Sequence, residues 1–151
     1  PAAQQEVTPG ASVFSQYCLD DRLLQRLRAL PASSIATGMN LSPLLIAYTP
    51  HRLLAATYHR NAAVNLWTIQ WLTVPPATAT ALLAQRRPDY LLYCPQDPMF
   101  MTMAQGAPAG LLAQIAQGRP PNWLRPALPL NDGGMLYAVR PNTLRTPSIT
   151  N

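Results

Sequence analysis

The polar run His59-Arg60-Asn61 contains the residue types in this sequence that are best suited to binding a ligand. An arginine holds phosphate or carboxylate groups bidentately, and a histidine and an asparagine beside it can bond the hydroxyl groups of a sugar or a headgroup. Together with Tyr58 and His51, these three residues form the predicted ligand-binding set. A purely structural interpretation stays open, in which Asn61 caps the next helix and His59 bonds a loop carbonyl.

The residues that must position this run are 53–58, which contain leucine, alanine and threonine without polar alternation. Such a strand is typical of a parallel sheet that is covered by helices on both faces. Ligands of these sheets gather outside the carboxyl ends of the strands. We therefore expect the side chains of residues 59–61 to emerge at a ligand-facing edge.

The sequence predicts no metal site, no cofactor and no catalytic residue. His51 and His59 would lie about 26 Å apart on an extended chain, and no further ligand has metal spacing. Neither phosphate-binding glycine pattern is present, and there is no Gly-x-Ser-x-Gly nucleophile motif. Only six residues are acidic, which leaves few choices for a carboxylate pair.

The charge of the chain is +5, and all eleven basic residues are arginines. One interpretation is an anionic partner, such as a phosphate-bearing ligand or a membrane surface; the other is coding bias. The arginines are scattered, which favours the second. Nucleic-acid binding would need a basic stripe with interleaved aromatic residues, so we expect no nucleic-acid partner.

Helical and strand patterns alternate along the chain, with helices predicted at 20–30, 41–48, 61–74, 78–87 and 109–117 and strands at 33–39, 53–58 and 90–93. Residues 96–108 show no clear element, and 122–125 look like a connector. Apolar runs at 128–130 and 135–139 flank Asn-Asp-Gly-Gly, which predicts a hairpin. The expected fold is α/β, with a three-layer, mainly parallel sheet between helices and a C-terminal β-hairpin. Residues 1–15 are expected to be a linker, 16–140 one domain and 141–151 a tail.

The two cysteines are expected to meet at one edge of the sheet. Cys94 follows the strand 90–93, and Cys18 precedes the first helix, which begins near the same edge. This placement favours a disulfide between them, while two independent buried thiols are the alternative. A disulfide would indicate an oxidising compartment.

Two apolar groups have competing interpretations. Trp67 and Trp71 stand four residues apart on one helical face, which suits core packing better than the stacking of a sugar ring or a place at a membrane interface. The methionine-rich run 99–103 suits either an adaptable contact surface or a loop over the core.

A series of short motifs in residues 18–139 resembles the soluble C-terminal region of bacterial polytopic inner-membrane proteins that are similar to GT-C-type glycosyltransferases using lipid-linked sugars. The matching pieces, in order, are Cys18, Leu30-Pro31, Ile35-Ala-Thr37, Thr49-Pro-His51, Tyr58-His-Arg-Asn61 and Asp89-Tyr-Leu-Leu-Tyr-Cys94. The Tyr-His-Arg-Asn run is the most specific of them. The catalytic carboxylates of such enzymes have no counterpart here.

The resemblance implies a domain on the periplasmic face of the inner membrane, whose partner is the N-terminal transmembrane region of the same protein. The first hypothesis is a non-catalytic domain that helps to position an anionic lipid, a lipid-linked sugar or a saccharide. The second is a protein-interaction module of a membrane complex, and the third is a small independent hydrolase. The positive net charge suits a domain that faces an anionic bilayer.

Overall fold

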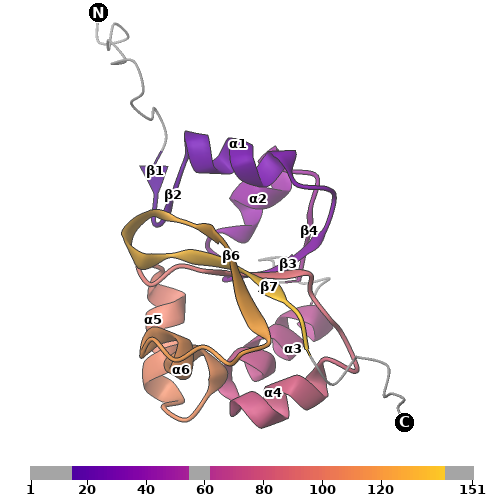
Figure 1. Ribbon diagram of the computed structural model, residues 1–151, viewed down its shortest axis with the longest axis vertical. Helices are drawn as coiled ribbons and strands as arrows, with labels where there is room; N and C mark the ends of the chain where they lie inside the picture. The colour runs from indigo at the N-terminus through magenta and orange to yellow at the C-terminus, as the bar shows by residue number, and fades with distance from the viewer. Residues whose placement is uncertain (1–14, 55–61, 142–151) are drawn as a thin grey trace, which may run out of the picture.

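The computed structural model describes residues 15–54 and 62–141 and contains a five-stranded mixed sheet (Figure 1). The strand order is β4 (Arg52–Leu53), β3 (Ser34–Ala36), β5 (Tyr90–Tyr93), β7 (Met135–Val139) and β6 (Leu124–Pro129). The first three strands are parallel to one another, whereas β7 runs antiparallel to both β5 and β6. The predicted α/β class and the C-terminal hairpin are confirmed.

Helices lie on both sides of this sheet (Figure 1). One side carries α1 (Asp21–Ala29) and α2 (Ser42–Tyr48), which contact each other. The other side carries α3 (Ala62–Thr73), α4 (Pro76–Leu82), α5 (Pro98–Gly106) and α6 (Leu111–Ala116). No helix among the described residues is both long enough and apolar enough to cross a bilayer.

The first helix forms for the reasons that the sequence indicates. The Asp20 side chain accepts a hydrogen bond from the Leu23 N–H at 2.9 Å, so it caps the free amide groups of the first turn. Arg26 and Arg28 lie in the last turn, where the helix dipole favours cations. The helix ends at Ala29, and its extended C-cap residue Leu30 stands directly before a proline.

The sequence-based prediction for residues 96–108 was wrong, because α5 occupies most of them. Asp97 caps α5 by accepting the Met99 N–H at 3.0 Å, and Pro98 stands at the first helical position. An Asp-Pro pair followed by methionines, which are good helix formers, is a helix start.

The strand predicted at 53–58 also differs from the structure. Among the strands that the structure describes, β4 pairs with β3 alone and so lies at the edge of the sheet, and its Arg52 side chain is exposed. Residues 55–61 lie outside the described part of the chain. The predictions for Tyr58, His59, Arg60 and Asn61 therefore lie outside the residues that the structure describes.

Three shorter elements also depart from the prediction. α4 ends at Leu82 and not at residue 87, since residues 83–86 form successive turns. β6 begins at Leu124, inside the predicted connector. A small hairpin of β1 (Ser15–Gln16) and β2 (Leu19–Asp20) turns through Tyr17, which has a φ of 53°.

The outer strand β6 is irregular. Its ladder with β7 is shifted in register between Pro126 and Leu128. Pro126 and Pro129 lack the backbone N–H that a strand offers to a neighbour. Prolines and bulges of this kind are typical of edge strands.

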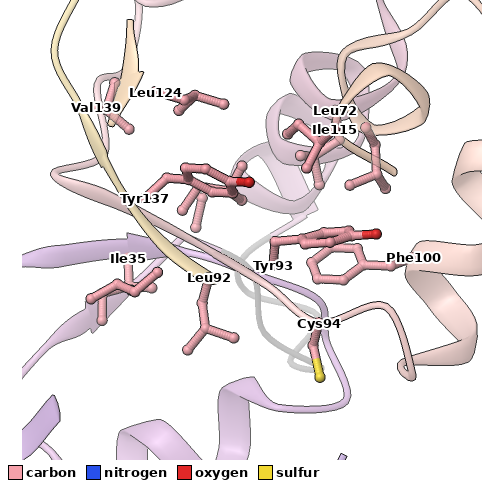
Figure 2. Packing of buried hydrophobic residues seen from close by; sticks show 14 of the residues in the cluster. Ile35, Leu72, Leu92, Tyr93, Cys94, Phe100, Ile115, Leu124, Tyr137 and Val139 are labelled. Atoms are coloured by element: carbon pink, nitrogen blue, oxygen red, sulfur yellow. The ribbon is translucent and has the colours of Figure 1, made fainter. Parts of the chain in front are cut away.

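Aromatic side chains on the side of the sheet that carries α3 dominate the core there. Trp71 is fully buried and stacks on Trp67, with ring centroids 5.4 Å apart. Trp123, which precedes β6, packs at a tilt against Trp71, with ring centroids 6.2 Å apart. Figure 2 shows Leu72 and Ile115 in the same core. The interpretation of Trp67 and Trp71 as core residues is confirmed.

Gly110 marks the point where α6 begins against the end of α3. A Cβ atom at Gly110 would lie 2.5 Å from the carbonyl oxygen of Thr73, which is backbone and cannot move aside easily. We expect Gly110→Ala to lower the free energy of unfolding by about 1–3 kcal/mol. Gly106→Ala is the matched control, because no described atom lies within 4 Å of its Cβ position. Urea unfolding measures both, and equal losses would contradict the prediction.

Candidate functional site

The carboxyl ends of the parallel strands bring two loops together at one edge of the sheet. Residues 37–40 follow β3, and residues 94–97 follow β5, its parallel neighbour. The Thr37 hydroxyl donates to the Leu92 carbonyl at 3.0 Å and so ties the first loop to β5. This is the edge at which ligands of α/β sheets bind.

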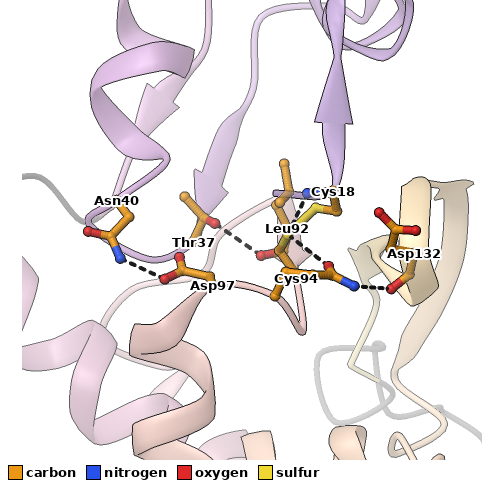
Figure 3. The surroundings of a disulfide bond; sticks show 8 residues. Cys18, Thr37, Asn40, Leu92, Cys94, Asp97 and Asp132 are labelled. Atoms are coloured by element: carbon orange, nitrogen blue, oxygen red, sulfur yellow. Dashed lines mark hydrogen bonds between the residues drawn. A yellow bond between two sulfur atoms is a disulfide. The ribbon is translucent and has the colours of Figure 1, made fainter. Parts of the chain in front are cut away.

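A buried carboxylate joins these loops (Figure 3). Asp97 is fully buried, and its Oδ1 accepts hydrogen bonds from the Asn40 side-chain amide at 2.7 Å and from the Met99 N–H. Its Oδ2 has no hydrogen-bond partner among the described residues. A Cβ atom on Gly38 would lie 2.7 Å from this oxygen, so a larger residue at position 38 would displace the Asp97 side chain.

The bond to Asp97 fixes the orientation of Asn40. A carboxylate only accepts hydrogen bonds, so Asn40 must turn its NH₂ group inward. Its carbonyl oxygen then points away from Asp97, and the side chain is exposed (Figure 3). The result is an exposed acceptor, held in one orientation by a buried acid, at the ligand-binding edge of the sheet.

An apolar cavity of about 320 Å³ lies at the end of the same strand β5. The lining residues are Tyr93, Pro95, Phe100, Met101, Ala104, Gln105 and Ala116. Figure 2 shows Tyr93 turned toward Phe100 of α5, with their ring centroids 5.9 Å apart, while Leu92 points to the opposite side of the sheet. Aromatic walls with a few polar groups are typical of small-molecule sites.

Burial raises the pKa of Tyr93 above its ordinary value near 10, and the neighbouring Tyr137 raises it further. The folded protein then keeps this proton to a higher pH than the unfolded chain does. Its contribution to stability is therefore complete below about pH 10 and is lost as the pH rises through the folded-state pKa. Burial also raises the pKa of Tyr137.

We therefore expect the free energy of unfolding to fall above about pH 10, and to fall less steeply in Tyr93→Phe. Urea unfolding between pH 8 and 11 tests this. Tyr90→Phe, at the partly exposed start of the same strand, is the control. An equal slope in wild type and Tyr93→Phe would contradict the prediction.

The predicted disulfide between Cys18 and Cys94 is present, with the two Cα atoms 5.6 Å apart (Figure 3). Both residues are fully buried, and the Cys18 N–H lies 2.9 Å from Cys94 Sγ. The bond joins the β1–β2 turn to the loop that also holds Asp97. The Gln96 side chain donates to the Asp132 carbonyl at 2.6 Å, which adds the β6–β7 turn to the same cluster. A buried disulfide is typical of a protein from an oxidising compartment.

His51, the one predicted ligand residue that the structure describes, is buried and bonded at both ring nitrogens. Nε2 donates to the Leu27 carbonyl at 2.6 Å, and Nδ1 accepts the Ser33 N–H at 3.1 Å. The ring thus links the end of α1 to the segment before β3. In this arrangement neither nitrogen of His51 is free for a ligand. Within residues 15–54 and 62–141, no three His, Cys, Asp or Glu side chains gather as a metal site.

Sequence reasoning missed Asn40 and Asp97. The Asp-Pro helix start could have marked Asp97 as a cap, but no local pattern indicates its bond to Asn40, which lies 57 residues away. No protein-family model and no curated protein sequence matches this chain, so the candidate site depends on the geometry at the carboxyl edge alone.

Proposed function

We propose that this chain is a non-catalytic domain that helps to position a saccharide or a lipid-linked sugar, on the periplasmic face of a bacterial inner membrane and within a protein related to glycosyltransferases. The observation that carries the proposal is the exposed Asn40 amide, which buried Asp97 orients at the carboxyl edge. Amide oxygens accept hydrogen bonds from sugar hydroxyl groups. The cavity at the end of β5 exposes Met101, Gln105 and Ala116 of its lining and so offers a surface for an apolar group.

A binding role fits this geometry better than catalysis. Asp97 is fully buried, and one of its oxygens already accepts two hydrogen bonds. A general acid or base must reach the proton that it transfers. Asp97 therefore acts as a positioning residue for Asn40 and for the start of α5.

The compartment is supported by the disulfide, since such bonds persist in oxidising environments such as the periplasm. Roles for Tyr58, His59, Arg60 and Asn61 stay predictions from the sequence. The variant Arg60→Ala tests the role of Arg60. We expect it to lose binding of anionic saccharides while its unfolding midpoint stays unchanged.

The central test is a titration of the purified chain with a panel of neutral and anionic oligosaccharides, followed by NMR. We expect Asn40→Ala to weaken binding about fivefold, as for one lost hydrogen bond. Asn122→Ala is the control, because this asparagine is also exposed but precedes β6. Absence of saccharide binding by the wild type, or equal effects of the two variants, would overturn the proposal.

A protein-interaction module is the second candidate. Met101 is 49% exposed at the cavity, and methionine-rich surfaces adapt to partners. Trp67 is buried, which leaves α5 as the surface for this alternative. Loss of association with the membrane region of the same protein in Met101→Asp, with saccharide binding intact, would favour it. Turnover by the isolated chain would instead favour an independent hydrolase.

A further inference from the structure

Two large apolar side chains of α2 are exposed. Ile46 is 42% exposed and Tyr48 is 58% exposed. The other large apolar side chains that are exposed among the described residues, Leu66 and Met101, belong to α3 and α5 on the opposite side of the sheet (Figure 1). α2 carries no charged residue in its sequence, Ser-Pro-Leu-Leu-Ile-Ala-Tyr.

Two hollows between α1 and α2 adjoin Tyr48. One has a volume of about 390 Å³, and its lining combines apolar Leu24 and Leu44 with polar Asp21 and Gln25. The other has about 410 Å³ and is bounded by Thr49 and Pro50. Both hollows are lined by Arg28 and Tyr48, so a cation and an aromatic ring stand where the two hollows meet. Within the described part of the chain, the Arg28 guanidinium has no hydrogen-bond or ion-pair partner.

The net charge of α1 is positive. α1 contains three exposed arginines, Arg22, Arg26 and Arg28, and one aspartate, a net charge of +2. The aspartate, Asp21, lies seven residues before Arg28, about 10 Å away along the helix axis. Asp21 nevertheless lines the hollow of about 390 Å³ together with Arg28, whereas the hollow of about 410 Å³ has no carboxylate in its lining. An anionic group at Arg28 would therefore bind in this second hollow, where the cation has an aromatic neighbour.

We propose that α1 and α2 form the surface by which this domain contacts an anionic lipid bilayer, with Arg28 on a lipid phosphate and with Tyr48 and Ile46 at the boundary between headgroups and acyl chains. Tyrosine is enriched at that depth because its ring is apolar and its hydroxyl is polar. Arginine can extend its charge to the phosphates while its aliphatic part covers apolar surface. The charge of the surface complements anionic lipids, whereas a protein partner would need a specific acidic counterpart.

The inference extends the proposed function, from which it takes only the membrane location. The saccharide site would lie at the carboxyl edge of the strands, and the lipid contact would lie on α1 and α2. The two can fail separately, because saccharide titration and vesicle binding are independent measurements.

The test is co-sedimentation of the whole chain with vesicles of equal parts phosphatidylglycerol and phosphatidylcholine, and with vesicles of phosphatidylcholine alone. We expect binding to the anionic vesicles only, and weaker binding as the salt concentration rises from about 0.1 to 1 M. Arg28→Gln should weaken the vesicle partition coefficient about fivefold. The double variant Arg28→Gln with Tyr48→Ser should partition onto the vesicles still more weakly than Arg28→Gln alone.

Matched controls separate this surface from the general charge and apolarity of the chain. Arg86→Gln removes an exposed arginine that follows α4, and Leu66→Ser removes a side chain as exposed as Tyr48. Both should bind vesicles like the wild type, as should Asn40→Ala. Failure of the wild type to bind anionic vesicles, or an equal loss in Arg28→Gln and Arg86→Gln, would overturn the inference. Binding of inorganic phosphate without vesicle binding would also overturn it.

Discussion

Replacement of both Cys18 and Cys94 with alanine is expected to lower the free energy of unfolding by about 4.5 kcal/mol. The disulfide joins residues 76 positions apart, so it removes much of the conformational freedom of the unfolded chain. Small domains are stable by only about 5–15 kcal/mol in total. The variant is therefore expected to be near the limit of stable folding.

Urea unfolding of the oxidised wild type and of the double variant measures this loss. Dithiothreitol should destabilise the wild type by a similar amount and should leave the double variant unchanged. If the reductant destabilises both proteins equally, the loss does not come from the bond. A double variant as stable as the oxidised wild type would also contradict the prediction.

Trp71→Ala is expected to lower the free energy of unfolding by about 3–5 kcal/mol. Trp71 is fully buried and packs against both Trp67 and Trp123, so truncation leaves a cavity beside both rings. Its indole N–H has no hydrogen-bond partner among the described residues. Trp71→Phe therefore removes no hydrogen bond and should cost much less than the alanine variant.

Leu66→Ala is the matched control on the same helix, because Leu66 is 58% exposed. We expect its effect on the free energy of unfolding to stay within about 0.5 kcal/mol. Thermal or urea unfolding, followed by circular dichroism, compares the three variants. Similar losses for Trp71→Ala and Leu66→Ala would show that the aromatic stack does not dominate this core.

Elements whose signals are local could be predicted from the sequence. Asp20 before a run of spaced leucines indicated α1, and Asn131-Asp-Gly-Gly134 between apolar runs indicated the β6–β7 turn. β5 was recognisable because Tyr90–Tyr93 is apolar between turn residues. These cases need no knowledge of distant parts of the chain.

Features set by tertiary contacts were beyond local patterns. In the strand order, β3 stands between β4 and β5, which leaves β4 at the edge of the sheet. No feature of the β4 sequence itself indicates this position. The cysteine pair could be predicted because both cysteines flank elements that end at one edge. Asn40 and Asp97 could not, because each looks locally like a loop or capping residue and their bond depends on the neighbouring positions of β3 and β5.

The irregular outer strand β6 has a consequence for self-association. An exposed edge strand normally presents a row of free amides and carbonyls that can template a second chain into fibrils. Pro126 and Pro129 interrupt that row, and the register shift between Pro126 and Leu128 disturbs the ladder beside them. This edge is therefore a poor template for strand pairing between two molecules of the protein. A high local concentration of the domain should then not lead to polymerisation through β6.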